Sequence, residues 1–504
     1  MARRRQVPGR SALDKDLKKV TFFEEAGQFV SRSLLRPAAG LILLVLAGLL
    51  ASVFVGHGSG AIGIIAGAAL GAYTAINIGA NDVTNNVGAA VGARAITMMQ
   101  ALIIAAVFDA AGALLAGGEV VKTISSGIVH GDAMPDGAAF VSVMLAALMA
   151  AALSINLATW LGAPISTTHA IVGGVLGAGV AAAGFSAISW QSMWEITLSW
   201  VLSPLISAVV AAGFLAFIYE FIVYRQNKIN AATRWLPVLL GVMGGSFAAY
   251  LAFKALANVV DISLNTALAA GLVIGVVTWR ISVPILRRRA EGLENRNQSV
   301  RKLFRLPLVF SAALLSFAHG ANDVSNAIGP LSAIVHAAST DNLSQTVTVP
   351  FWVMTIGAFG ISAGILLFGP RLILIVGKEI TRLNPIRAFC VAISAAVTVL
   401  VASWFGLPVS STHIAIGSVF GVGFFREWYM QNSMRRAQYI EMKAGENAVV
   451  RPKRKATPEE ARRRYLVRRS HFMTIIAAWV ITVPLAAVLA AILYKILALI
   501  SFQA

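Results

Sequence analysis

The hydrophobic residues of this chain fall into long continuous runs that are separated by short polar connections. A helix of about 20 apolar residues is long enough to cross a bilayer. A membrane β-barrel would instead show short alternating segments. The pattern therefore predicts an all-α polytopic membrane protein. The expected helical segments are 38–56, 61–80, 97–117, 139–161, 164–184, 194–224, 235–257, 264–286, 306–335, 349–369, 387–405, 408–425 and 471–500.

The basic residues lie in alternate connections, which predicts the orientation of the chain. Of the 41 lysines and arginines, 37 lie in 1–36, 225–234, 280–305, 371–387 and 426–469. The intervening connections 57–60, 118–138, 185–193, 258–263 and 336–348 hold only Lys122. By the positive-inside rule the first group is cytoplasmic. We therefore expect a multi-pass protein of the cytoplasmic (inner) membrane, with the N-terminus inside and the C-terminus outside.

This distribution also explains the net charge of +19. Basic loops beside membrane helices give no reason to expect a nucleic-acid partner, and the expected surroundings are the lipid bilayer. We interpret 287–305 and 426–469 as solvated cytoplasmic loops rather than as sites for anionic lipid. The single cysteine, Cys390, excludes an intramolecular disulfide framework and a cysteine-rich metal site.

Two motifs each occur twice, in the same order. GANDVTNN (79–86) returns as GANDVSNA (320–327), and ATWLGAPISTTH (158–169) returns as ASWFGLPVSSTH (402–413). The offsets, 241 and 244 residues, are nearly equal, which indicates a duplicated chain. The charge pattern makes 61–80 enter the membrane from outside and 306–335 from inside. We therefore expect two inverted-topology repeats whose broken or re-entrant helices meet at a midplane site, as in many transporters.

The expected organisation follows from these repeats. It comprises a basic cytoplasmic tail (1–37), an extra helix with a short outer loop (38–60), a first repeat (61–224), linking helices with a basic loop (225–305), a second repeat (306–425), a basic loop (426–470) and a C-terminal helix (471–504). Whether 164–184 and 408–425 are re-entrant or full spans is left open by the sequence.

The second motif has the chemistry of an anion site. Gly-x-Pro breaks a helix, and proline suits the first turn of the next one. The hydroxyl residues that follow are typical helix N-caps, and free backbone N–H groups there attract anions. The expected anion-coordinating residues are Ser166, Thr167, Thr168, Ser410, Ser411 and Thr412. His169 and His413 are the last residues of the two copies. The sequence leaves open whether these histidines are structural or contact a proton or the substrate.

The first motif places acids and amides inside apolar segments, where they are costly unless functional. Asp82 and Asp323 could hold a cation, exchange a proton or accept hydrogen bonds from a protonated oxyanion. Asn81 and Asn322 precede them, while Asn85 and Asn326 lie four positions beyond these on the same helical face. Asp109 is a third acid within an apolar segment. Its counterpart in the other repeat is Ile361, so we treat Asp109 as a candidate ion ligand of one half only.

These motifs closely resemble those of the inorganic phosphate transporter (PiT) family, which includes sulfate permeases. The resemblance covers roughly 61–500. It implies cation-coupled phosphate import, with Asn81, Asp82, Asn322 and Asp323 at the substrate and ion site and the six hydroxyl residues coordinating the anion. Thr84 and Asn86 stand where the family more often has small apolar residues, and their extra hydroxyl and amide groups could alter the coupling ion or the preferred oxyanion.

Together these features predict a symporter that imports inorganic phosphate by alternating access, driven by protons or sodium ions. The coupling cation is the only cofactor expected. Sulfate or arsenate remains an alternative substrate, and a homodimer is one possible assembly. An anion channel is less favoured because channels line a pore with rings of like residues. An enzyme such as a phosphatase is not expected, because no nucleophile or metal cluster has suitable spacing.

Overall fold

The computed structural model describes residues 35–55, 60–161, 165–254, 262–339, 347–380, 383–444 and 469–501. Within these ranges the regular structure is helical, apart from one isolated bridge between Val129 and Ile188. Ten helices are long and apolar enough to cross a membrane, or up to eleven if a bent pair counts as one span. The prediction of an all-α polytopic membrane protein is confirmed. The tail 1–34 and the loop segment 445–468 lie outside the described residues.

Most of the long helices overlap the predicted apolar runs, but three shorter helices lie in predicted connections, and the run 306–335 is divided into two helices. Beyond Leu35–Phe54 they are α2 (Ala61–Gly92), α3 (Met98–Ala116), α4 (Gly118–Ser126), α5 (Gly137–Leu161), α6 (Thr167–Ala183), α7 (Trp190–Ile218), α8 (Lys228–Lys254), α9 (Leu264–Ala290), α10 (Asn297–Leu303), α11 (Arg305–Asp323), α12 (Ser325–Ser339), α13 (Phe351–Ile380), α14 (Pro385–Trp404), α15 (Ser411–Asn432), α16 (Met434–Ala444) and α18 (Arg469–Ser501).

The expected end of the second run, near Ala80, is wrong. Helix α2 continues without interruption to Gly92. Asp82 therefore lies inside a helix, where its carboxylate accepts hydrogen bonds from other side chains instead of capping a helix end. Backbone carbonyls around Asp82 remain in the helix and are not released as ligands.

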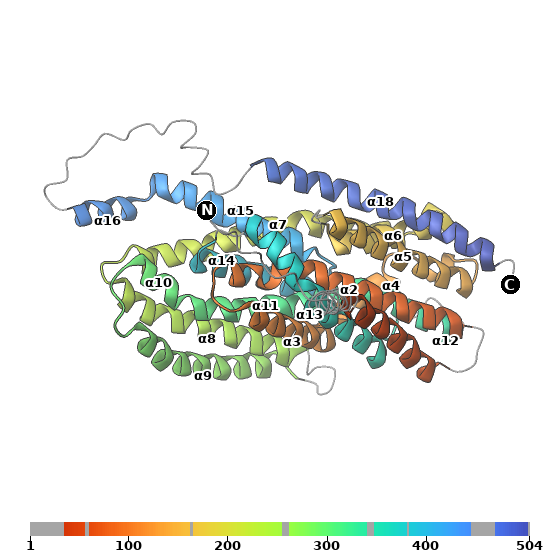
Figure 1. The fold of residues 1–504 in the computed structure, drawn as a ribbon, viewed down its shortest axis with the longest axis horizontal. Helices are drawn as coiled ribbons and strands as arrows, with labels where there is room; N and C mark the ends of the chain where they lie inside the picture. Colours follow the sequence, from red (N-terminus) through yellow and green to blue (C-terminus); the bar gives the residue numbers. More distant parts are fainter. Residues whose placement is uncertain are drawn as a thin grey trace, which may run out of the picture.

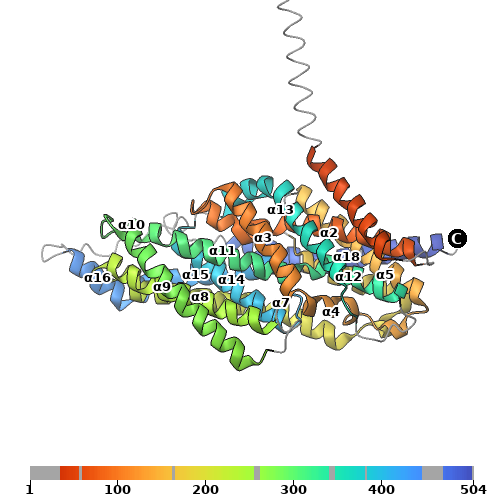
Figure 2. The ribbon, with the colours of Figure 1, turned by 90° about the horizontal axis from the view of Figure 1, so that it is seen from below.

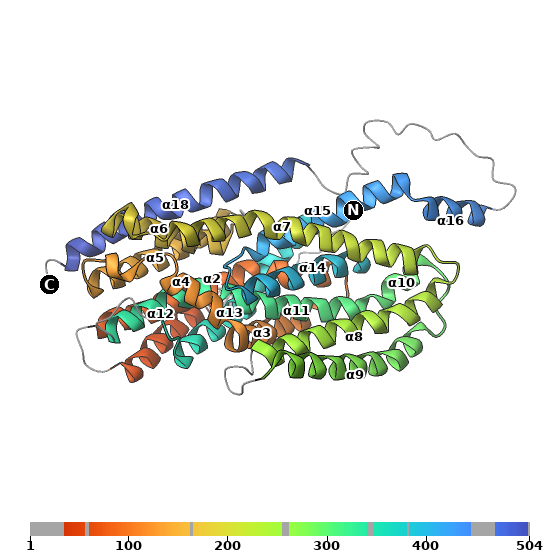
Figure 3. The same cartoon turned by 180° about the vertical axis from the view of Figure 1, so that it is seen from behind.

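Most helices run along the long axis of the molecule (Figure 1). Helix α18 lies along one edge, next to α6, and the paired helices α8 and α9 form the opposite edge (Figures 1 and 3). The helix Leu35–Phe54 leaves the bundle at an angle (red in Figure 2). Helices α10 and α16 lie at one end of the molecule, and that end contains the basic last turns of α9 and α10. We call it the basic end.

Helices α5 and α6 form a hairpin that returns to the end from which it starts. The segment before α5 pairs with the segment after α6, because the His130 N–H donates to Ala187 O (2.9 Å) and the Ser189 N–H donates to Ile128 O (3.0 Å). Gly137 and Ala183, the outer ends of the hairpin, are each only a few residues from this pairing. The two helices therefore form an antiparallel hairpin, in which α5 contains a candidate membrane span (Gly137–Thr159) and α6 is a shorter apolar helix (Thr167–Ala183).

The two halves pack on each other in matching ways at the first motif. A Cβ atom added to Gly79 of α2 would overlap the backbone carbonyl of Ile361 in α13. A Cβ added to Gly320 of α11 would likewise overlap the carbonyl of Asp109 in α3. Only glycine allows such close helix contact. The first helix of each half thus packs on the second helix of the other, and Asp109 and Ile361 occupy equivalent places.

The same reciprocity appears at the second motif. Gly177 of α6 lies directly against the backbone of Ala487 in α18, and Gly421 of α15 lies directly against that of Ala208 in α7. Helix α18 therefore packs on α6 in the same way as α7 packs on α15. These exchanged contacts are consistent with inverted repeats that interlock.

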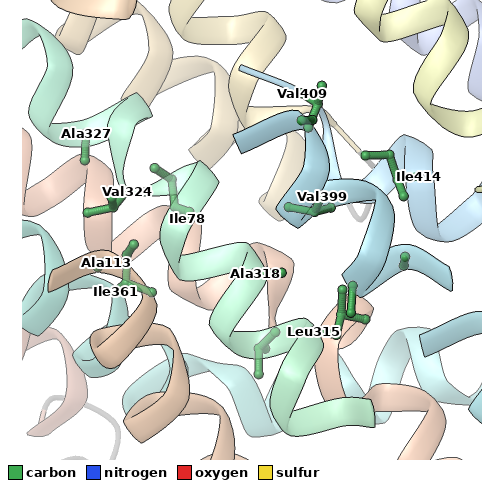
Figure 4. Close-up of a cluster of buried hydrophobic side chains, with 14 of the residues drawn as sticks. Ile78, Ala113, Leu315, Ala318, Val324, Ala327, Ile361, Val399, Val409 and Ile414 are labelled. Atoms are coloured by element: carbon green, nitrogen blue, oxygen red, sulfur yellow. The ribbon is translucent and has the colours of Figure 1, made fainter. Parts of the chain in front are cut away.

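Apolar side chains fill the space around this crossing (Figure 4). Ile78 of α2, Val324 at the junction of α11 and α12, and Ile361 of α13 point into the same cluster. Val399 of α14 and Val409 from the loop before α15 extend it on the other side. The cluster holds the motif-bearing segments together and surrounds their polar groups with apolar atoms.

Candidate functional site

The two acidic motifs occupy different local structures. Asp82 lies inside α2, whereas Asp323 is the last residue of α11, with Val324 separating it from α12. Both carboxylates are buried, with exposed fractions of 1% and 0%. The duplicated motifs therefore deliver one buried carboxylate from each half.

The two hydroxyl motifs form helix starts, as predicted. Ser166 caps α6 by accepting from the His169 N–H (3.2 Å), and Ser410 caps α15 by accepting from the His413 N–H (3.4 Å). The chain before α15 leaves the helical conformation at Gly406, whose φ of +68° favours glycine. Residues 162–164, which precede α6, lie outside the described residues.

Asp82 gathers donors from both halves. Its Oδ2 accepts from Thr167 (3.2 Å) in the first turn of α6. Its Oδ1 accepts from the Asn81 amide (2.9 Å) and from Thr412 (3.3 Å) in the first turn of α15. The Asn85 amide lies 3.4 Å from the same oxygen. Two helix starts from different halves thus converge on one carboxylate.

Two further contacts join the halves in a matched pair. Asn85 donates to Thr412 Oγ1 at 2.9 Å, and its counterpart Asn326 donates to Thr168 Oγ1 at 3.1 Å. The spacing argument that placed Asn85 and Asn326 beside the motif carboxylates therefore identified the residues that cross between the halves. The match is not complete, because Thr168 donates to the Val409 carbonyl (3.0 Å) rather than to a carboxylate.

Asp323 has its own hydroxyl donor. Ser411, in the first turn of α15, donates to its Oδ2 at 2.7 Å, as Thr167 does to Asp82. Of the carboxylate's two oxygens, Oδ1 is buried and has no hydrogen-bond partner among the described residues. A buried acceptor without a donor is unfavourable unless a ligand supplies the interaction.

Asn322 is placed differently from Asn81. Its amide donates to Ser403 Oγ (3.0 Å) and to the Leu407 carbonyl (3.1 Å), and its side-chain oxygen accepts from the Val409 N–H (3.2 Å). These contacts hold the break between α14 and α15. In this conformation Asn322 therefore positions the loop that carries Ser410 and Ser411.

The sequence analysis missed His319, which lies at the centre of the acidic groups. Its Nε2 is 3.0 Å from Asp323 Oδ2 and 3.7 Å from Asp82 Oδ2, and its Nδ1 contacts Asp109 Oδ1. The imidazole is fully buried. The available signal was its position directly before the second GAND copy, where Ile78 precedes the first copy.

Asp109, predicted as an ion ligand of one half, is connected to the site through His319. Its other oxygen lies 3.4 Å from the Asn86 amide, so one departure from the family pattern contacts this acid. The other departure, Thr84, donates to the Asn81 carbonyl within α2. His319 and Asp109 thus add a polar pair to one side of an otherwise duplicated site.

The two motif histidines pack against each other. The His169 and His413 rings lie 4.5 Å apart in a T-shaped arrangement, and His169 also contacts Trp200 at 3.8 Å. Trp200 donates to the Pro408 carbonyl (2.9 Å) in the break before α15. This places both rings in a contact between the two helix starts.

The arrangement combines features for a cation and for an anion. One oxygen each of Asp82 and Asp323 and one nitrogen of His319 lie within 4.8 Å of one another, and the two carboxylates are the groups that a cation would use. The adjacent helix starts carry hydroxyls and positive dipole ends, which favour negative charge. A cation and an oxyanion could therefore be held side by side.

Comparisons with known proteins agree on one family. The sequence profile described as "Phosphate transporter family" matches residues 78–490. A Helicobacter pylori protein named "Putative phosphate permease" is 41% identical, with 95% of this chain and 98% of that protein covered. A Thermococcus kodakarensis relative with the same designation is 36% identical, with 83% of this chain and 94% of that protein covered.

The fold agrees as well. A solved structure titled "The sodium-dependent phosphate transporter" matches with a TM-score of 0.77 and 32% identity, covering 87% of this chain and all of that chain. Residues 78–490, which the family profile matches, contain both copies of both motifs. The chain is a multi-pass membrane protein that belongs to the phosphate transporter family.

Proposed function

We propose that this protein imports inorganic phosphate together with a cation, by alternating access around the site built by Asp82 and Asp323. The observation that carries the proposal is the convergence of two buried carboxylates with the starts of α6 and α15. Phosphate would bind at the helix starts, where the Thr167, Ser411 and Thr412 hydroxyls would turn from the carboxylates to donate to the anion. The basic end would face the cytoplasm.

Electrostatics supply the reason for coupling. Two unit charges 4.8 Å apart interact by roughly 3.5 kcal/mol at an effective dielectric constant of about 20. A phosphate ion beside Asp82 and Asp323 would meet electrostatic repulsion from both carboxylates, in addition to the repulsion between the carboxylates themselves. A cation bound between them would remove that repulsion, so each ion would raise the affinity for the other.

Sodium is the first cation to test. The structural relative is described by its title as sodium-dependent. Hard cations prefer oxygen ligands, and Asp82 and Asp323 supply carboxylate oxygens while Asn81, Asn85 and Thr412 supply further oxygens nearby. Protons are the second candidate, with the same carboxylates as acceptors.

The reciprocal packing supports a wider second repeat. We place α18 within it, because α18 stands to α6 as α7 stands to α15. Alternating access would then consist of movement between interlocked halves around a shared site.

The test is uptake of labelled phosphate into proteoliposomes with imposed sodium or proton gradients and with sulfate as competitor. Asp82→Asn and Asp323→Asn should each reduce gradient-driven uptake at least tenfold, while Asp132→Asn, an exposed acid remote from the site, should not. Full uptake by both site variants would refute the proposal. Uptake of sulfate instead of phosphate would keep the mechanism and change the substrate.

A further inference from the structure

A second feature, outside the transport site, is an open pocket of about 720 Å³ at the basic end of the molecule. It lies where the loop after α2 and the first half of α3 meet the end of α9, helix α10 and the start of α11. The sequence suggested only a solvated loop at 287–305. The structure instead shows this segment forming one wall of a cavity.

Three positive charges line the pocket without acidic partners. Arg289 comes from the last turn of α9, Lys302 from α10 and Arg305 from the start of α11. All three are exposed, no aspartate or glutamate lines the pocket, and none of the three forms an ion pair within the described ranges. By contrast, Arg296 nearby is paired with Glu294 at 2.6 Å.

The rest of the lining is mainly apolar. Ile103 and Ile104 of α3 and Val309 of α11 belong to membrane-spanning segments, and Ile103 is 50% exposed. A free phosphate ion would use the cations but gain nothing from these side chains. A molecule with an anionic head and a hydrocarbon chain would use both.

We propose that this pocket binds an anionic phospholipid of the leaflet at the basic end. The phosphate headgroup would contact Arg289, Lys302 and Arg305, and an acyl chain would lie against Ile103, Ile104 and Val309. Basic pockets between helices on the cytoplasmic side of membrane proteins are suited to such headgroups. The bound lipid would connect the ends of α3 and α11, the two helices that carry Asp109 and His319.

The test compares lipid binding by the purified full-length protein with that of two matched variants. Phosphatidylglycerol is titrated into detergent-solubilised protein, and bound lipid is counted by native mass spectrometry. The pocket variant is Arg289→Gln/Lys302→Gln/Arg305→Gln. The control, Arg225→Gln/Arg234→Gln/Arg301→Gln, removes the same charge from residues of the basic end that do not line the pocket.

We expect the pocket variant to bind phosphatidylglycerol roughly a hundredfold more weakly, because each basic residue near an anionic membrane surface contributes about fivefold. The control should bind like the wild type. Equal weakening in both triple variants would show general charge attraction and overturn the proposal.

A further variant separates lipid from free phosphate. Ile103→Thr/Val309→Thr keeps all three cations and weakens only the contact with an acyl chain. We expect it to lower phosphatidylglycerol affinity several-fold, with thermal melting confirming that the variant is folded. Unchanged affinity, together with displacement of the lipid by millimolar inorganic phosphate, would identify a phosphate site and refute the lipid assignment.

Discussion

Replacing His319 with glutamine should destabilise the protein because the imidazole separates three buried carboxylates. Asp82 and Asp323 lie on its Nε2 side and Asp109 on its Nδ1 side. Ionised carboxylates only accept hydrogen bonds, so both ring nitrogens would donate, as in a charged imidazolium. Glutamine keeps some polarity but removes that charge and one of the two contacts.

The magnitude follows from the geometry. Uncompensated repulsion between Asp82 and Asp323 at up to 4.8 Å is roughly 3.5 kcal/mol at an effective dielectric constant of about 20. Removing one partner of a buried ion pair costs about 3–5 kcal/mol. We therefore expect His319→Gln to lose about 3–4 kcal/mol of unfolding free energy in sodium-free buffer.

The assay is unfolding by sodium dodecyl sulfate in mixed micelles, followed by the fluorescence of the chain's ten tryptophans. His130→Gln is the matched control, because His130 is exposed. The double variant Asp109→Asn/His319→Gln should lose less than the sum of the single variants, with a coupling of about 1–3 kcal/mol. A loss no greater than that of His130→Gln, with additive single effects, would refute the view that His319 neutralises this cluster.

Three further predictions use the same unfolding assay. Gly79→Ala should lower the free energy of unfolding by about 1–3 kcal/mol, because the added methyl group overpacks the contact between α2 and α13. Gly213→Ala is the control and should lower it little, because a Cβ there meets nothing within 4 Å. Equal losses in the two variants would contradict the close approach of α2 and α13. Lys228→Met should lower the free energy of unfolding by about 1–3 kcal/mol, because the buried ammonium donates to the carbonyls of Val223, which ends the preceding helix, and of Arg225 just beyond it. Stability like that of the wild type would show that those carbonyls find other donors. Thr123→Val should lower the free energy of unfolding by about 1 kcal/mol and reduce phosphate uptake, because Thr123 donates to the Gly406 carbonyl (2.7 Å) in the break before α15. Unchanged phosphate uptake would show that this contact is not needed for transport.

The fold was largely predictable because membrane helices are encoded locally. A continuous apolar run is enough to predict a span, and the charge of its flanking loops predicts its direction. The end of α2 was misplaced because Asn81 and Asp82 look like a helix terminus when their partners are unknown. Those partners, Thr167 and Thr412, are 85 and 330 residues from Asp82 in the sequence.

The site was predictable where the duplication doubled the signal. Asn85 and Asn326 followed from helical spacing around a repeated motif, and the structure places both at contacts between the halves. His319 carried no such signal, because the other half has Ile78 at the equivalent position. Its partner Asp109 is 210 residues away, so only the folded chain brings the two together.

This asymmetry bears on how a duplicated transporter could work. In the proposed alternating access, inward and outward states exchange the roles of the two halves, so an exactly symmetric site would favour neither state. Here His319 and Asp109 occupy the places held by Ile78 and Ile361 in the other half. Two buried polar, ionisable groups on one side and two aliphatic ones on the other would make the two states of that cycle electrostatically unequal. In the proposed cycle the ion gradient would set the direction of transport, and His319 and Asp109 would set only the relative stability of the inward and outward states.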